Sequence, residues 1–474
     1  MNLVSVRSVS QRKRMKRSLC AEEGCSTKIR ARRLSFDALP EDIMSRIMSD
    51  LTLKEAVRTS VVSSKWRWYW KYHPNLTFDI AMVLGSKAKR NQSSDRYKRM
   101  LGIKRSIDRV NYILRKHSGL PVIKLVVKFE LRKEHAKHID GWVSFAIASW
   151  ARIITLNFSP YLGSYEDNYS FPCHLFNNEN VTCLQALRLD SVNLGPSPDF
   201  CGFPNLKMLA LDHVLSLQDL QYLPKCPLLE WSSIRWCYQK CNLNAFEPLS
   251  RLKYLCVQDC AVNNIDLVAP NLNTFEYSGP QILINFHNCL KLKKASFELK
   301  VQKTLEYVFT GIPNLLPHVE TLRVEVFVIS EIPGFTHAPL VFSRLRRLAL
   351  KLQLNGRTSV LQLACLLEAA PLLEDLRLDM DCFNERAHPI DGDLIVDCRH
   401  YHLKTACISG FCGEGGQVEL VKYIMRNATR LGRLTVDPVN RINNLPGFMS
   451  EYFGRSSALR KLVPLDKAGV VRVL

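Results

Sequence analysis

A short pattern of apolar and variable positions recurs along most of the chain. In each copy an apolar residue is followed by two variable residues, an apolar residue, one variable residue and a last apolar residue. On a strand the last two apolar side chains point to the same face. The copies begin at Ile153, Leu184, Leu206, Leu252, Leu272, Val319, Leu345, Leu373 and Leu431, with weaker copies at Leu229, Leu292 and Leu403.

The spacing of these copies identifies the architecture. Successive starts from 184 to 431 lie 20 to 30 residues apart, mostly within or near the length range of leucine-rich repeats. One unit cannot bury its apolar face alone, whereas stacked units share a core and place parallel strands on the inner curve of a horseshoe. An all-helical repeat is the competing interpretation, but the strand segments are too short for it. We therefore predict an α/β leucine-rich repeat solenoid over residues 120–397.

Residues 34–73 have the pattern of three short helices. Pro40 suits the first helical position, because that position needs no backbone N–H. Ile43, Ile47 and Leu51 follow at intervals of four residues, which places them on one face of the first helix. We therefore predict a small helical module before the repeats.

The end of this module is unusually aromatic. Thr52 and Glu55 form a capping box that begins the second helix. Trp66, Trp68 and Trp70 then fall within five residues in the third helix. A module of this size is marginally stable alone and cannot bury that much aromatic surface. We predict that a partner completes its burial; the alternative is that the tryptophans pack against the repeats.

The net charge of +21 is concentrated in two segments. Residues 1–33 carry +8 and residues 84–118 carry +9, so together they hold 17 of the 21 charges. The first segment is predicted to be a disordered basic tail, and its run Arg12–Arg17 is either a nuclear import signal or a solvated stretch. Residues 79–119 are predicted to be a basic connector ending in an amphipathic helix. Because nucleic-acid-binding domains carry their charge on the folded surface, we do not expect nucleic acid as a partner.

Candidate chemistry is sparse. The chain shows neither a transmembrane stretch nor a secretory signal, so its 16 cysteines are expected to be reduced thiols. Cys237 and Cys260 follow the last strand positions of their repeats by three residues, where a side chain can bond the exposed backbone of the turn. His135 and His138 lack a third metal ligand, and the glycine-rich run 413–416 lacks the Lys-Ser/Thr of a phosphate-binding loop. We predict no metal, no cofactor and no catalytic residue.

The two ends of the repeat region resemble motifs of one plant family. The first resembles the F-box motif through Leu39-Pro40-Glu41-Asp42-Ile43, Ile47-Met48-Ser49, Thr59-Ser60-Val61-Val62-Ser63 and Lys65-Trp66-Arg67. The second resembles the FBD motif through Cys398, Leu403-Lys404, Ile408, Gly410-Phe411, Gly413, Glu419 to Ile424 and Asn427-Ala428. In this order the motifs are similar to those of plant F-box/leucine-rich-repeat/FBD proteins.

The resemblance implies an organisation and a role. It implies an N-terminal three-helix F-box over 34–78, an FBD segment over 398–440 that continues the solenoid, and a C-terminal tail over 441–474. In this family the F-box binds the small Skp-type adaptor of SCF-type cullin–RING ubiquitin ligases, and the repeats hold a target protein. Matching positions imply that the adaptor face is formed or supported by Leu39, Pro40, Ile43, Ile47, Leu51, Val61, Trp66 and Trp70. Met44 and Met48 stand where the family usually has Leu or Ile.

The target surface is predicted from variable positions inside the strands, which project from the concave face. Charged residues recur there in equivalent places, as Arg188 and Asp190, Arg323 and Glu325, and Arg377 and Asp379. They either contact a charged target or pair across neighbouring strands.

These observations predict the non-enzymatic substrate-recognition subunit of a ligase, located in the nucleus or the cytoplasm, with no membrane partner. Two alternatives remain: a leucine-rich repeat scaffold without ligase function, and a nucleic-acid-binding protein that uses the basic segments.

Overall fold

The structure is a computed structural model that describes residues 39–61, 66–80, 82, 96–119, 121–159, 167–176, 183–197, 200–214, 223, 225–245, 247–300, 311–328, 341–354, 360–382, 398–413, 416–442 and 448–474. The predicted basic tail and residues 83–95 of the predicted connector lie outside the described residues.

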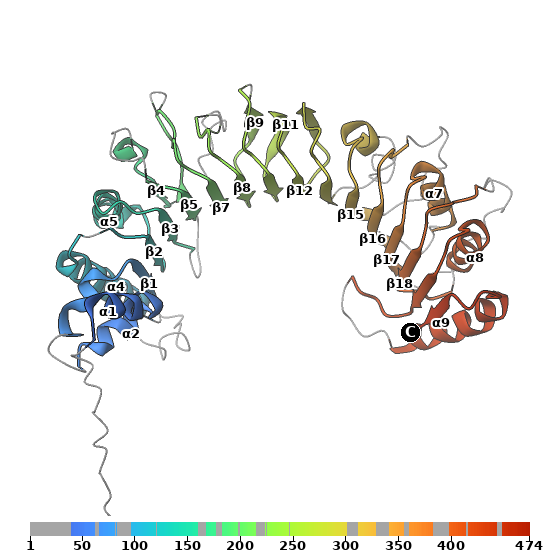
Figure 1. The fold of residues 1–474 in the computed structure, drawn as a ribbon, viewed down its shortest axis with the longest axis horizontal. Coiled ribbons are helices and arrows are strands. Elements are labelled where there is room, and N and C mark those ends of the chain that lie inside the picture. Colours follow the sequence, from blue (N-terminus) through green and yellow to red (C-terminus); the bar gives the residue numbers. More distant parts are fainter. Residues whose placement is uncertain are drawn as a thin grey trace, which may run out of the picture.

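Most of the chain is organised around one parallel sheet. Among the described residues its strands, in both spatial and chain order, are β1 (Asn75–Asp79), β2 (Lys124–Lys128), β3 (Ile153–Asn157), β5 (Ala186–Asp190), β7 (Met208–Asp212), β8 (Trp231–Arg235), β10 (Tyr254–Gln258), β12 (Thr274–Gly279), β14 (Lys294–Leu299), β15 (Thr321–Val328), β16 (Arg347–Leu354), β17 (Asp375–Cys382), β18 (Thr405–Ser409), β19 (Arg433–Asp437) and β20 (Val471–Val473). Figure 1 shows an arch with these strands on its inner curve. This is the leucine-rich repeat horseshoe that the sequence pattern predicts.

Alternation along each strand explains the arch. Leu187 and Leu189 of β5 are fully buried and pair with Leu209 and Leu211 of β7, while Arg188 between them is exposed. The second and fourth residues of the strands therefore form a continuous core. The first, third and fifth residues project from the concave side, which we call the inner face. All twelve copies of the sequence pattern coincide with strands, so that prediction is confirmed.

Three strands of the sheet were not among the predicted copies. In β1 the place of the anchoring apolar residue is taken by His73, which is buried. The β2 strand has the full pattern at Val122, Leu125 and Val127, all buried, but follows the basic connector. The β20 strand has only three residues and lies in the segment that was expected to be a tail.

The outer curve is covered by helices and smaller sheets. The helices are α4 (Arg96–Lys116), η4 (Lys133–His135), α5 (Ala136–Ala148), η5 (Cys173–Phe176), η7 (Val360–Ala364), α7 (Cys365–Ala369), α8 (Gln417–Asn427), α9 (Phe448–Lys461) and η9 (Val463–Leu465). A three-stranded sheet contains β9 (Cys241–Ala245), β11 (Val262–Val268) and β13 (Leu283–His287), and a two-stranded one contains β4 (Tyr169–Ser170) and β6 (Val192–Asn193). No described helix has the length and apolar character needed to cross a membrane.

The N-terminal module contains α1 (Glu41–Asp50), α2 (Leu53–Thr59) and η2 (Trp66–Tyr72). The predicted third helix is thus a 3₁₀-helix, and Pro40 precedes the first helix as its N-cap instead of opening it. One cluster of buried apolar residues extends from Met44 to Leu462. The module therefore shares its core with the solenoid.

The prediction of a C-terminal tail over 441–474 was wrong. This segment contains α9, η9 and β20, and β20 pairs with β19 as the last strand of the main sheet. Its apolar residues are too scattered to show the repeat pattern, which is why the sequence did not reveal it. The FBD-like residues nearby are structural: Leu403, Ile408 and Phe411 are fully buried, and Gly410 has a positive φ at a place where a Cβ would collide with the carbonyl oxygen of Met380.

Candidate protein-interaction surfaces

The N-terminal module has a complete interior of its own. Met44 and Met48 of α1 pack inward with Leu53 of α2, and Trp66 and Trp70 of η2 are buried in the same cluster. The interval of four residues keeps Met44 and Met48 on one side of α1. Trp66 and Trp70 therefore cannot contact a partner directly, and of the predicted adaptor-face residues these two can only support the surface from inside.

A second set of apolar side chains in this module faces outward. Ile43 and Ile47, which were predicted to share one face of α1, are 42% and 37% exposed, because Met44 and Met48 occupy the inward face. Val61 is 88% exposed and Trp68 is 54% exposed. We define the apolar rim as Pro40, Ile43, Ile47, Val61, Trp68 and Tyr72, all of which are exposed. Leu39 and Leu51, also predicted for this face, are half-buried against the core.

Local bonds fix the helices that carry the rim. The predicted capping box is present: the backbone N–H of Thr52 donates to Glu55 Oε2 at 2.9 Å, and the Thr52 side chain accepts from the Glu55 N–H at 3.3 Å. The Thr52 N–H and the Thr52 hydroxyl, which donates to the same Oε2 at 2.7 Å, hold the pKa of Glu55 below its ordinary value, since both bonds favour the carboxylate. On the rim itself, Lys71 Nζ lies 4.0 Å from the centre of the Trp68 ring.

Two buried histidines join the module to the first repeats. His73 Nδ1 accepts from the Asn75 N–H at 3.1 Å, so its Nε2 carries the proton and donates to the Leu51 carbonyl oxygen at 2.9 Å. His117 repeats the arrangement, accepting at Nδ1 from the Gly119 N–H and donating from Nε2 to the His73 carbonyl oxygen at 3.2 Å. Burial lowers the pKa of His117. The module is thereby held to the solenoid by neutral, fully bonded side chains.

The predicted charged pairs on the inner face behave in two ways. The acids bond to neighbouring strands: Asp190 accepts from Asn157 at 2.7 Å, Glu325 lies 3.3 Å from Lys351, and Asp379 accepts from Ser409 at 2.6 Å. The cations Arg188, Arg323 and Arg377 are exposed. Only Arg377 also bonds the acid of its own pair, at 3.0 Å from Asp379, among the interactions described here. The cross-strand interpretation therefore applies to the acids, whereas the three arginines are exposed on the surface.

Two aromatic stacks on the inner face were not predicted. Trp231 and Tyr254 stand at the first positions of β8 and β10, and their rings stack at 5.2 Å with an interplanar angle of 2°. His213 and Trp236 follow β7 and β8 and stack at 5.0 Å. Both pairs are separated by 23 residues, one repeat length, and that spacing could have revealed them.

The floor between the two stacks is made of small side chains. Ala210, Ser233 and Cys256 occupy the third positions of β7, β8 and β10 and are buried. A strand rises about 3.3 Å per residue, so the stacks at either end of these strands stand roughly 16 Å apart. We call the two stacks together with the small side chains between them the aromatic site.

The cysteines and histidines that suggest metal ligands have structural partners instead. Cys237 and Cys260 donate to backbone carbonyl oxygens at 3.2 to 3.4 Å in their turns, as the repeat positions predict. The hydrogen bond between the two thiols and burial raise the pKa of Cys237. His135 lies near Glu134, whereas His138 bonds Asn111. No group of three potential ligands gathers within the described part of the chain.

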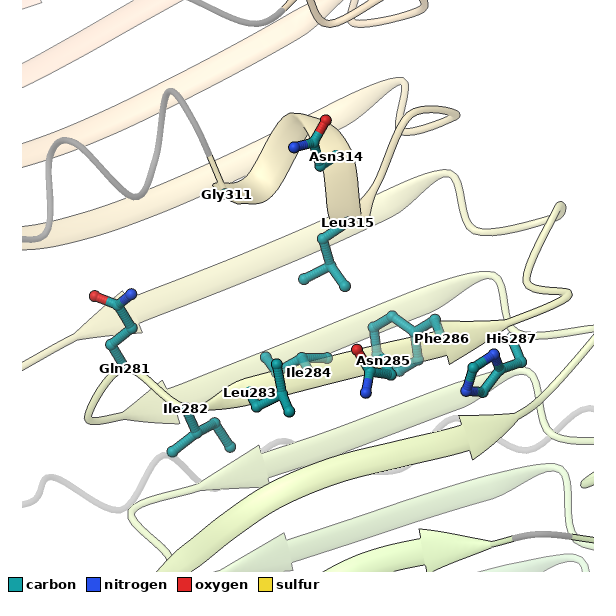
Figure 2. A pocket seen from close by; sticks show the side chains of 10 residues that line it. All are labelled: Gln281, Ile282, Leu283, Ile284, Asn285, Phe286, His287, Gly311, Asn314 and Leu315. Atoms are coloured by element: carbon teal, nitrogen blue, oxygen red, sulfur yellow. The ribbon is translucent and has the colours of Figure 1, made fainter. Parts of the chain in front are cut away.

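A cavity of about 810 Å³ lies on the outer side of the arch, between β13 and residues 311–315. Figure 2 shows its lining of aliphatic and amide side chains, including Leu283, Asn285 and Leu315. His287 is the one titratable residue in this described lining, and it lies 2.9 Å from Asp266. The cavity therefore holds no pairing of nucleophile and base.

Comparisons with known proteins agree with this architecture. The family model described as At1g61320/AtMIF1, LRR domain, matches residues 113–462, and the F-box domain model matches residues 36–75. The F-box/FBD/LRR-repeat protein At1g13570 of Arabidopsis thaliana is 27% identical over 407 residues, covering 84% of this chain and 89% of the relative. The Arabidopsis F-box/LRR-repeat protein At5g38396 is 30% identical over 200 residues, which cover 40% of each chain.

Among solved structures, the crystal structure of a TLR13–ssRNA13 complex aligns with 70% of this chain and 48% of its own, at 16% identity and a TM-score of 0.36. A likeness this weak carries no argument about function.

Proposed function

This chain belongs to the plant F-box/leucine-rich-repeat/FBD family, and on that premise we propose that it is the substrate-recognition subunit of an SCF-type cullin–RING ubiquitin ligase. The F-box would bind the Skp-type adaptor, which connects to the cullin, and the inner face would bind a target protein. The chain would supply no catalytic group. It would act by raising the effective concentration of target lysines near the ubiquitin carrier.

The apolar rim is the observation that carries this proposal. The module already has a buried interior, so its rim is not needed for folding. Exposed apolar side chains clustered on one small module mark a surface for another protein. Ile43 and Ile47 from α1 and Trp68 from η2 are the rim residues we assign to direct adaptor contact, with Pro40 and Val61 beside them.

His73 and His117, the two histidines between the module and the repeats, form what we call the histidine joint. This joint supports the same proposal. A subunit that presents a target must hold it at a fixed position relative to the ligase. His73 bonds both the C-cap of α1, through the Leu51 carbonyl oxygen, and the start of β1, through the Asn75 N–H. Because His73 itself is buried, water competes poorly for these two bonds. The shared core and this joint would make the module and the repeats move as one body.

For the target we propose contacts at the inner-face arginines and the aromatic site. Arg188 lies beside Met208, the residue that precedes the small-residue floor on β7. Aromatic and arginine side chains are the types that most often dominate binding energy at interfaces. Arg323 and Arg377 would extend this surface along the arch, whereas Asp190, Glu325 and Asp379 would orient neighbouring strands.

The test is binding of the full chain to the purified Skp-type adaptor. Ile43→Asp should weaken binding at least about tenfold, because it places a charge in an apolar contact. Ile123→Asp is a matched control, since Ile123 is 44% exposed but lies at the start of the repeats. Equal loss in both variants, or no binding by the unaltered chain, would favour a repeat scaffold. Salt-dependent binding to nucleic acid that persists in Ile43→Asp would favour the nucleic-acid alternative.

A further inference from the structure

Helix α9 reverses the usual arrangement of a surface helix. The side facing the protein carries Gly454, Ser457 and Ala458, all buried. The opposite side carries large apolar side chains: Tyr452 is 69% exposed and Leu459 is 50% exposed. A surface helix ordinarily places its large apolar residues inward. Packing of this helix therefore does not account for its exposed residues.

The small residues of α9 are required by close approach to the preceding repeat. A Cβ at position 454 would collide with the carbonyl oxygen of Phe411. Gly413, with a φ of +81°, leaves room for the hydroxyl of Ser457. The helix thus lies directly on residues 411–413, and no larger side chain fits beneath it. The close contact at Gly454 and Ser457 therefore excludes large side chains from those inward positions.

The outward residues have the spacing of a helix-binding seam. Tyr452, Ser456 and Leu459 are separated by four and three residues, and Val463 follows four residues later in η9. All four are exposed. Alternating intervals of three and four residues place side chains along one seam of a helix pair, as in coiled coils. We call these four residues the α9 stripe.

Charge beside the stripe indicates the kind of partner. Arg455 and Arg460 are exposed and occupy the positions that flank the seam on either side. In helix pairs these flanking positions select the partner by charge. Along α9 itself there is one acid, Glu451, against Arg455, Arg460 and Lys461, which gives the helix a net charge of +2. The surroundings of the stripe are therefore basic.

We propose that the α9 stripe binds a helix of another protein that has apolar residues on its contact face and acidic residues beside them. A second copy of the chain fits less well, because a two-fold interface would bring the flanking arginines of both copies together. An anionic membrane also fits less well, because α9 is fixed to the solenoid along its opposite side and the stripe is narrow and interrupted by Ser456.

This surface is separate from the apolar rim. Figure 1 shows α9 at the C-terminal end of the arch and α1 at the other end. Both surfaces can be occupied at once, so the proposal holds whether or not the chain acts in a ligase.

The experiment measures binding of labelled synthetic helical peptides to the full chain by fluorescence anisotropy. Both peptides have about three heptads with Leu on the contact face, and they differ in carrying Glu or Lys at the flanking positions. The unaltered chain should bind the Glu peptide at least about tenfold more tightly than the Lys peptide. Leu459→Glu should abolish that binding without changing the melting temperature, because Leu459 is exposed.

Charge reversal decides whether the stripe itself is responsible, since the whole chain is basic. Arg455→Glu/Arg460→Glu should reverse the preference toward the Lys peptide. Arg105→Glu/Arg109→Glu, on the exposed side of α4, removes the same charge and should leave the preference intact. Equal effects of the two double variants would overturn the proposal. So would a dimer in light scattering that Leu459→Glu dissociates, or binding to phosphatidylserine vesicles that the Glu peptide does not displace.

Discussion

The helices at the two ends of the main sheet both expose apolar side chains, but they are constructed differently. At the N-terminal end, α1 carries two apolar stripes, with Met44 and Met48 inward and Ile43 and Ile47 outward. At the C-terminal end, α9 turns small residues such as Gly454 inward. The packing of α1 thus depends on large side chains that fill an interior. The packing of α9 depends on small side chains that allow the helix to lie directly against residues 411–413.

This difference separates residues that maintain the fold from residues available for binding. At each end the exposed residues can be changed with little effect on folding, and the buried ones cannot. Substitutions of the buried residues should destabilise the two ends for opposite reasons. The N-terminal module should be destabilised when side-chain volume is removed, and α9 when side-chain volume is added.

Removal of volume at the N-terminal end should have the largest effect. Trp70→Ala should cost the module about 3–5 kcal/mol of stability, because Trp70 is buried and a cavity would remain. Trp68→Ala, two residues away on the exposed side of η2, should cost less than about 1 kcal/mol. Hydrogen exchange of the α1 and α2 amides in the full chain measures both. Similar destabilisation by the two variants would show that the rim belongs to the fold and would break the comparison.

Addition of volume at the C-terminal end should have the next largest effect. Gly454→Ala should destabilise α9 and β20 by about 1–3 kcal/mol, because the new Cβ meets the Phe411 carbonyl oxygen. Gly141→Ala is the control: it also lies within a helix, but open space surrounds it. There the change should stabilise by about 0.5–1 kcal/mol through helix propensity. Amide exchange in α9 that is unaltered by Gly454→Ala would mean that α9 does not lie against residues 411–413.

The sequence predicted the part of the fold that depends on repetition. Leucine at fixed intervals identified twelve strands because each repeat imposes the same burial on the same positions. It did not identify β1, where His73 replaces the apolar anchor, since a histidine that bonds two backbone groups has no apolar signature. Nor did it identify α9, because Gly454 and Ala458 give no inward stripe to detect.

The candidate surfaces were predicted only in part. In α1 two faces could point inward, because Ile43 and Met44 are both apolar. Only packing against α2 and η2 shows that the methionines are inside. On the inner face, the charged pairs were visible in one repeat at a time, whereas the Trp231–Tyr254 stack depends on side chains of two repeats meeting.

Lowering the pH should destabilise the histidine joint at the N-terminal end, by less than the two changes of side-chain volume destabilise their helices. Burial lowers the pKa of His117 below its ordinary 6.5, so the unfolded state binds a proton that the folded state excludes. This contribution to stability is present above about pH 6.5 and is lost as the pH falls below it, at no more than about 1.4 kcal/mol per pH unit. His117→Gln cannot titrate and should show a shallower dependence.

The Ser118 amide reports this opening, because it donates to the Lys71 carbonyl oxygen at 3.0 Å across the joint. Its exchange, corrected for the intrinsic rate, should accelerate between pH 7 and pH 5.5 in the unaltered chain more than in His117→Gln. Identical profiles would mean that His117 does not control the joint.

The smallest effect on stability is expected where the effect on binding should be greatest. Ile43→Asp and Leu459→Glu each replace an exposed apolar residue at one end of the arch, and each should change the free energy of unfolding by less than about 0.5 kcal/mol. Chemical denaturation of the two variants and the unaltered chain checks this. Each variant should lose only the partner assigned to its own end: the Skp-type adaptor for Ile43→Asp and the acidic helical peptide for Leu459→Glu. The two altered side chains lie at opposite ends of the arch and cannot contact each other. Loss of both partners by either variant, with its stability unchanged, would therefore mean that the two binding surfaces are not independent.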